Sequence, residues 1–208
     1  MNTMKQKPSL PLVLILEDDP DIAGAWKKLA EENGWAAQIA GSVESAVLFA
    51  RKNHSNIKLV MVDVMVPMTE EDLAHSNRVQ EERKSLQVQV RKQHAKTSPD
   101  TVELRLLDAE LAALDSVWRQ LIVMDGGFLF LEEARGEGWI GKWRFAICSA
   151  RDKAEGLKEL EDRLIITSGE RWLGWFSKPT RVEEMQQLLA AQFRDLTQKT
   201  RRKNGKSA

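Results

Sequence analysis

The sequence lacks the features that mark several broad classes of protein. It has a single cysteine, Cys148, so no disulfide can form within the chain, which suits a reducing compartment. Lysine plus arginine and aspartate plus glutamate number 31 each, so no overall charge attracts nucleic acid. No stretch approaches the roughly 20 apolar residues of a membrane span. The apolar run Leu12–Leu16 is also too short for the core of a signal peptide. We therefore expect a cytoplasmic protein that binds neither membrane nor nucleic acid.

Short apolar runs alternate with helical patterns over two parts of the chain. An apolar fraction of 42% over 208 residues is enough for a folded core. The apolar runs predict strands at residues 12–16, 36–40, 57–63, 144–148 and 172–177. Helical spacing predicts helices at about 20–33, 42–52, 128–134, 153–164 and 180–196. Strands that alternate with helices in this way predict an α/β fold with a parallel sheet, because each βαβ unit is right-handed.

The alternation is interrupted by residues 68–123, which carry no strand signal. The break at 98–100 predicts a helical hairpin with arms at about 69–96 and 99–123. The second arm has a seam of large apolar residues that alternate by four and three, as in a coiled coil: Leu107, Leu111, Leu114, Trp118 and Leu121. This seam could pack on the first arm, or it could contact a second copy or a partner protein. The weak apolar pattern of the first arm favours the second interpretation.

Polar residues follow the predicted strands. Asp18 and Asp19 come after the first strand, Asp63 ends the third, Ser149 follows the fourth and Lys178 follows the fifth. Because ligands bind beyond the carboxyl ends of parallel strands, we expect these side chains to share one pocket. Three carboxylates there would repel one another unless a cation compensates, and oxygen ligands select Mg²⁺.

These groups together suit chemistry on a phosphoryl group. With Mg²⁺ bound, Asp63 is a reasonable nucleophile towards a phosphoryl donor. Lys178 could neutralise one phosphate oxygen, and Ser149 could donate a hydrogen bond to another. An aspartyl phosphate would add about −1.5 to −2 charge, which suits a switch.

The same polar residues, in this order and at these strand ends, resemble those of response regulator receiver domains. The resemblance is carried by Asp18-Asp19, Asp63-Val64-Met65-Val66-Pro67, Ser149-Ala150 and Lys178-Pro179, and it covers residues 11–67 and 124–197. It implies a doubly wound, flavodoxin-like five-stranded sheet with strand order 2-1-3-4-5. The hairpin 68–123 departs from the family pattern as an insertion after the third strand.

The resemblance also implies individual roles. Asp63 resembles the phosphoacceptor. The implied Mg²⁺ ligands are Asp18, Asp19, Asp63 and the backbone carbonyl of Met65. Ser149 and Lys178 resemble the residues that bind the phosphate. Trp175 occupies the place of an aromatic switch residue, and Pro179 resembles a proline that follows a cis peptide bond.

The sequence therefore predicts a stand-alone response regulator rather than an enzyme. It would accept a phosphoryl group from a histidine kinase or phosphotransfer protein and signal to a downstream protein through the hairpin. One alternative is a degenerate receiver that acts as a constitutive scaffold, or that forms a homodimer through the hairpin. Another is a phosphohydrolase of similar fold, although no glycine-rich phosphate loop follows the first strand. Residues 198–208 are expected to form a basic tail.

Overall fold

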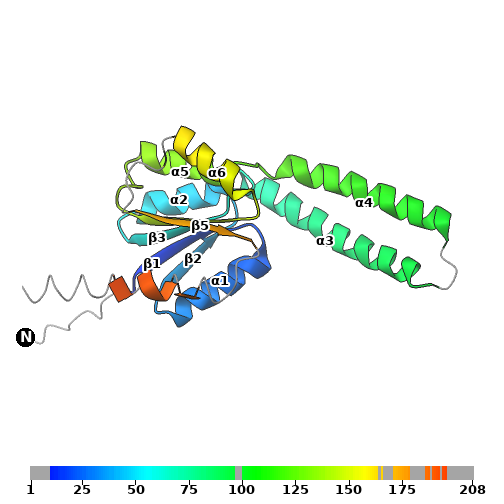
Figure 1. Ribbon diagram of the computed structural model, residues 1–208, viewed down its shortest axis with the longest axis horizontal. Coiled ribbons are helices and arrows are strands. Elements are labelled where there is room, and N and C mark those ends of the chain that lie inside the picture. The colour runs from blue at the N-terminus through cyan, green and yellow to red at the C-terminus, as the bar shows by residue number, and fades with distance from the viewer. Residues whose placement is uncertain are drawn as a thin grey trace, which may run out of the picture.

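The fold is built on a five-stranded parallel sheet (Figure 1). The computed structural model describes residues 10–96, 100–163, 165, 171–178, 186, 187, 189–192, 194 and 195. The strands are β1 (Leu12–Leu16), β2 (Ala36–Ala40), β3 (Ile57–Val62), β4 (Arg144–Ser149) and β5 (Trp172–Ser177). They pair in the order β2-β1-β3-β4-β5, and every pairing is parallel. The predicted fold class and strand order are confirmed.

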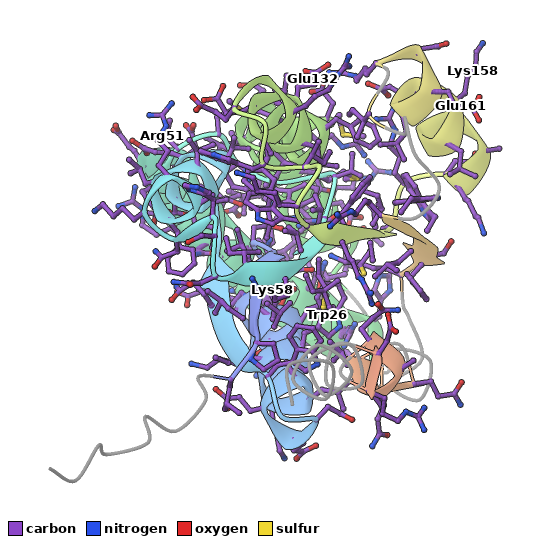
Figure 2. All side chains as sticks on the ribbon, turned by 90° about the vertical axis from the view of Figure 1, so that its left-hand side faces the viewer. Trp26, Arg51, Lys58, Glu132, Lys158 and Glu161 are labelled. Carbon is purple, nitrogen blue, oxygen red and sulfur yellow. The ribbon has the colours of Figure 1, made fainter. Side chains whose placement is uncertain are left out.

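Helices cover both faces of the sheet. The helix α1 (Pro20–Glu32) lies on one face. On the other face lie α2 (Val43–Asn53), α5 (Gly126–Gly136) and α6 (Lys153–Asp162). Figure 2 shows the two sides: Trp26 of α1 lies below the sheet, and Arg51 of α2 and Glu132 of α5 lie above it. This is the doubly wound arrangement that the alternating sequence pattern predicts.

The central strands are apolar at every position because both of their faces are buried. Leu14 and Val60 belong to the core beneath α2 and α5, whereas Ile15 and Met61 belong to the core beneath α1. All four side chains are fully buried. Successive side chains of a strand point to opposite faces. A strand between two helical layers therefore needs a continuous apolar run rather than an alternating one.

The inserted segment forms the expected hairpin. Its arms, α3 (Glu70–His94) and α4 (Thr101–Leu121), lie side by side and project away from the sheet (Figure 1). On α4, Leu107 is buried and the other four seam residues are half-buried. Arg83 of α3 pairs with Asp115 at 2.5 Å, and its guanidinium lies 5.2 Å from the ring centre of Trp118. The seam therefore packs against α3 within the chain, as in the first of the two interpretations.

The two ends of the hairpin are held together beside β3. Val66 and Val123 form an isolated antiparallel bridge. The segment that leads into α3 docks on the start of α2, where the amide of Val43 donates to the carbonyl of Pro67 at 2.9 Å. The Ser42 hydroxyl, which caps α2, donates to the Glu70 carboxylate at 2.7 Å. A loop tolerates an insertion when its ends lie this close.

Several of the predicted features lie outside the described residues. These are Pro179, the basic tail 198–208, residue 164 at the end of the helix expected at 153–164, and most of the helix expected at 180–196. Among the helices that the structure describes, none is both long and apolar enough to cross a membrane.

Candidate functional site

The candidate site lies at the carboxyl edge of the sheet, where the ends of neighbouring strands are tied to one another. The amide of Asp63 donates to the carbonyl of Leu16 at 2.8 Å, which joins the end of β3 to the end of β1. The amide of Lys178 donates to the carbonyl of Ser149 at 2.9 Å, which joins β5 to β4. Parallel pairing therefore brings these polar side chains to one edge, as expected.

Three carboxylates meet at this edge, and they differ from the expected set in one member. Glu17, Asp18 and Asp63 each offer an oxygen, and these oxygens lie within 4.8 Å of one another. Glu17 and Asp63 are buried, and Asp18 is partly buried. Glu17 was not singled out from the sequence, because only Asp18 and Asp19 were assigned to the end of the first strand.

Asp19 has a different position from the one expected of a metal ligand. Its Oδ1 accepts hydrogen bonds from the amides of Asp21 at 2.9 Å and Ile22 at 3.1 Å, so it is the N-cap of α1. The signal for this was Pro20, because proline is favoured at the first position of a helix and so marks the preceding residue as the cap. The acidic pair at the cluster is therefore Glu17-Asp18.

Lys178 is the cation of the cluster. Its Nζ lies 2.5 Å from Asp63 Oδ2 and 2.7 Å from Glu17 Oε2, and it lies 5.6 Å from the ring centre of Trp26. Burial alone would lower the pKa of Lys178, but the charges of Asp63 and Glu17 outweigh it and raise the pKa above its ordinary value. Lys178 is therefore held in its charged form between two carboxylates.

One lysine does not compensate three carboxylates. Burial raises the pKa of Glu17 to about 8. The charge of Lys178 lowers this pKa, and the charge of Asp63 raises it. Burial, with the charge of Asp63, raises the pKa of Asp18 to about 7. A cluster made only of oxygen donors, with carboxylates that are costly to ionise, fits a hard divalent cation such as Mg²⁺. The Met65 amide donates to Asp63 Oδ1 at 3.2 Å, so Met65 lies beside this cluster.

Gly127, which follows the hairpin at the start of α5, lies against the backbone of Asp63. The amide of Gly127 donates to the carbonyl of Val64 at 2.9 Å. A Cβ atom at Gly127 would lie 2.1 Å from the carbonyl oxygen of Asp63, which no real side chain tolerates. A glycine at this position lets the start of α5 rest against the backbone of Asp63.

Ser149 and Trp175 occupy the β4 and β5 side of the site. Ser149 is fully buried, and its Oγ accepts a hydrogen bond from the Arg151 amide at 3.4 Å. Trp175 is 6% exposed and packs beside Phe128, with a distance of 6.4 Å between ring centres. A Cβ atom at Gly156 would lie 2.1 Å from the Trp175 ring, so α6 rests directly on this side chain. The buried indole N–H of Trp175 has no hydrogen-bond partner within the described ranges.

Arg151, which was not predicted from the sequence, links this side of the site to the end of the hairpin. Its guanidinium pairs with Glu159 of α6 at 2.6 Å and lies 5.5 Å from the ring centre of Phe128. Its Nη1 donates to the carbonyl of Met124 at 3.4 Å. No sequence motif marks an arginine two residues after Ser149, so only the structure shows this connection.

Comparison with known solved structures identifies the fold. No protein-family model matches the chain, and no curated protein matches it. Solved structures do match. The receiver domain of the Francisella response regulator 1452 has a TM-score of 0.51 at 17% identity, over 89% of this chain and 98% of that one. A response regulator receiver domain protein from Clostridium thermocellum has a TM-score of 0.51 at 12% identity, over 90% and 98%.

A chemotaxis protein gives the same result. The chemotaxis response regulator CheY4 of Vibrio cholerae has a TM-score of 0.52 at 14% identity, over 88% of this chain and 99% of that one. The strand order, the helices on both faces and the extra helices after β3 agree with this match. The chain has the fold of the CheY-like response regulator receiver domains, with a helical hairpin inserted after the third strand.

Proposed function

We propose that the chain is a signalling switch that accepts a phosphoryl group on Asp63 from a histidine kinase or a phosphotransfer protein. The observation that carries the proposal is the meeting of the Glu17, Asp18 and Asp63 carboxylates with Lys178 at the carboxyl edge of the sheet. The receiver fold agrees with it. We assign the protein to the cytoplasm, in keeping with a free, buried Cys148.

The transfer is a substitution at phosphorus. A carboxylate oxygen of Asp63 attacks the phosphorus of a phosphohistidine. A P–O bond forms while the P–N bond breaks, and the imidazole nitrogen keeps the electron pair and takes up a proton. Glu17, Asp18 and Asp63, with the backbone carbonyl of Met65, would hold Mg²⁺, which supplies positive charge to offset the phosphate oxygens. Asp19 is not part of this proposed ligand set, because it caps α1.

The residues around Asp63 would then respond to the new charge. Lys178 already lies 2.5 Å from Asp63 Oδ2 and can bind a phosphate oxygen through the same ammonium group. The Ser149 hydroxyl can donate to another oxygen. If Ser149 moves towards the phosphate, the backbone between Ser149 and Arg151 moves with it. That movement would reach Trp175 and, through Arg151, the end of the hairpin. The hairpin is therefore our proposed output surface for a downstream protein.

A constitutive scaffold with the same fold would have no use for this cluster. Burying three carboxylates beside one lysine opposes folding, as the raised pKa values of Glu17 and Asp18 indicate. A protein that serves only as a scaffold would be more stable without them. Retention of the cluster therefore supports the switch over the scaffold.

Tryptophan fluorescence during titration with Mg²⁺ and then beryllofluoride, a mimic of the aspartyl phosphate, tests the switch. We expect a saturable change that requires both additions and is absent from an Asp63→Asn variant. The Asp19→Asn variant is the matched control, because asparagine keeps the helix cap, and it should respond like the wild type. A response that persists in Asp63→Asn would contradict the proposal.

A further inference from the structure

The helix α4 has a second apolar face, separate from the one that packs on α3. Val102 and Leu106 are each 66% exposed, and Val117 is 37% exposed. Ala109 and Ala113 lie between them and are also exposed. We call these five residues the outer stripe. They follow one another at intervals of four, three, four and four residues, which is the spacing of one face of a helix.

The outer stripe cannot be covered by the other arm of the hairpin. At 3.6 residues per turn, its centre lies about 120° around α4 from the seam that packs on α3. The hairpin projects away from the sheet, so the α/β part of the described chain does not reach the distal half of α4 either (Figure 1). A run of apolar side chains this exposed on a projecting helix indicates a surface for another molecule.

The charges beside the outer stripe indicate what that molecule is. If Leu106 and Ala113 take the a positions of a heptad and Val102 and Ala109 take the d positions, Arg105 is at g, and Glu110 and the last stripe residue, Val117, are at e. Both charged residues are exposed, and neither has an ion-pair partner among the residues that the structure describes.

These two positions are complementary only in one arrangement of two identical helices. In a parallel pair, a g residue faces the e residue of the following heptad on the other helix, so Arg105 faces Glu110 of the partner subunit, and the same contact is repeated across the twofold axis. In an antiparallel pair, e faces e and g faces g, which sets acidic Glu103 and Glu110 against one another. The stripe is therefore complementary in charge to itself when two copies of this chain pack in parallel.

We propose that the protein forms a parallel homodimer in which the outer stripe of α4 packs on the outer stripe of a second copy. Leu106 and Val102 supply the large apolar contacts, and Ala109 and Ala113 let the two helices approach closely. Together with the two α3 helices, the pair would form a four-helix assembly with both receiver folds at the same end. The seam of Leu107, Leu111, Leu114, Trp118 and Leu121 stays inside each hairpin. The proposal does not depend on phosphorylation of Asp63.

Sedimentation equilibrium of the full-length chain over a wide dilution series tests the dimer. We expect the wild type to show a reversible monomer–dimer equilibrium, and Leu106→Glu to weaken it by at least about tenfold, because each interface would bury two glutamates. Val88→Glu is the matched control: Val88 is an apolar residue of α3 that is 47% exposed but lies outside the stripe. Circular dichroism establishes that both variants remain folded. A wild type that is monomeric throughout, or a Leu106→Glu variant that dimerises normally, overturns the proposal.

Charge reversal tests the orientation. Arg105→Glu and Glu110→Arg should each weaken the dimer a few-fold, because each sets two like charges against one another at both symmetric contacts. The double variant with both changes should recover wild-type affinity. A double variant that is weaker than either single variant would overturn the parallel arrangement.

Disulfide cross-linking tests the register. In a parallel pair, identical d positions face one another, so an Ala109→Cys variant should cross-link on mild oxidation. Asp108→Cys, one residue away and off the interface, should not. The native Cys148 is fully buried and does not interfere. Equal cross-linking of the two variants would contradict the assigned interface.

Discussion

At the residue scale, the site holds more negative charge than its one lysine offsets. Glu17, Asp18 and Asp63 share a pocket with Lys178, and the pKa values of Glu17 and Asp18 lie at about 8 and about 7. Carboxyl groups whose pKa values lie this far above the ordinary values make the metal-free protein less stable, and a bound cation would stabilise it again.

The two neighbouring aspartates should therefore respond differently to substitution. We predict that Asp18→Asn loses Mg²⁺ binding, because it removes a charged oxygen from the cluster. We predict that Asp19→Asn binds Mg²⁺ like the wild type, because asparagine preserves the cap of α1. Isothermal titration calorimetry with Mg²⁺ measures both. Loss of binding in Asp19→Asn would show that Asp19 is a ligand, as expected from the sequence, and retention of binding in Asp18→Asn would contradict both ligand sets, because Asp18 belongs to each.

The raised pKa values also set the sign of the pH dependence. Between about pH 4.5 and about pH 7 the folded protein holds protons on both Glu17 and Asp18 that the unfolded chain has released, and up to about pH 8 it still holds one on Glu17. The free energy of unfolding without Mg²⁺ should therefore fall as the pH rises through this window. Urea unfolding at several pH values measures it, and Asp18→Asn should flatten the slope. A wild type whose stability rises through this window, or an Asp18→Asn variant with an unchanged slope, would contradict the assignment.

The residues of the site could be predicted from the sequence only in part. Asp63 and Lys178 were found because Asp63 ends one predicted apolar strand and Lys178 directly follows another. Glu17 was missed because the sequence does not show whether the residue after Leu16 points into the pocket or away from it. In the structure, Glu17 points into the pocket, because its carboxylate oxygen lies beside those of Asp18 and Asp63.

At the element scale, the start of α5 is fitted to the backbone of Asp63. We predict that Gly127→Ala destabilises the protein by about 1–3 kcal/mol, because its Cβ would lie 2.1 Å from the Asp63 carbonyl oxygen. Gly136→Ala in the same helix has nothing within 4 Å of its Cβ and should be neutral or slightly stabilising. Thermal unfolding of both variants measures the difference. Equal stability of the two would contradict the close approach.

The hairpin shows what an apolar pattern can and cannot establish. The spacing of Leu107, Leu111 and Leu114 correctly predicted a helix with one apolar face. It did not identify what that face contacts, because α3 completes its side of the packing with residues of low hydrophobicity. Arg83 is one of these: its guanidinium covers Trp118 and pairs with Asp115. Cation–π and ion-pair contacts of this kind leave no periodic apolar signal.

At the scale of the whole molecule, the fold places the hairpin and the candidate site on one loop. Asp63 lies four residues before Pro67, whose carbonyl accepts a hydrogen bond from the start of α2. At the other end of the hairpin, Val123 pairs with Val66 and Arg151 reaches the carbonyl of Met124. A change at Asp63 can therefore reach the base of the hairpin in two ways. One is along the chain to Pro67, and the other is across the pairing of Val66 with Val123.

We predict that amide hydrogen exchange changes at the base of the hairpin when Mg²⁺ and beryllofluoride are added. The affected amides should lie at 66–73 and 122–127, whereas the distal parts of α3 and α4 should be unaffected, because both contacts lie at the base. Exchange followed by mass spectrometry measures this. A change confined to the residues around Asp63, with none at the base, would remove the hairpin as the output surface.

The overall fold was the most predictable part of the molecule. Five apolar runs separated by helical patterns restrict a chain of this length to few topologies, since parallel connections are right-handed. The projection of the hairpin was not predictable, because it depends on specific contacts at its base. These include the Ser42–Glu70 hydrogen bond, which joins residues 28 positions apart.

The most direct test of the central claim is the intact mass of the full-length chain after incubation with acetyl phosphate. We predict that the wild type gains one phosphoryl group only when Mg²⁺ is present, and that Asp63→Asn gains none. Fragmentation should place the group on Asp63. If the wild type remains unmodified with Mg²⁺ present, or if Asp63→Asn is labelled equally, Asp63 is not a phosphoacceptor and the cluster at the sheet edge has another purpose.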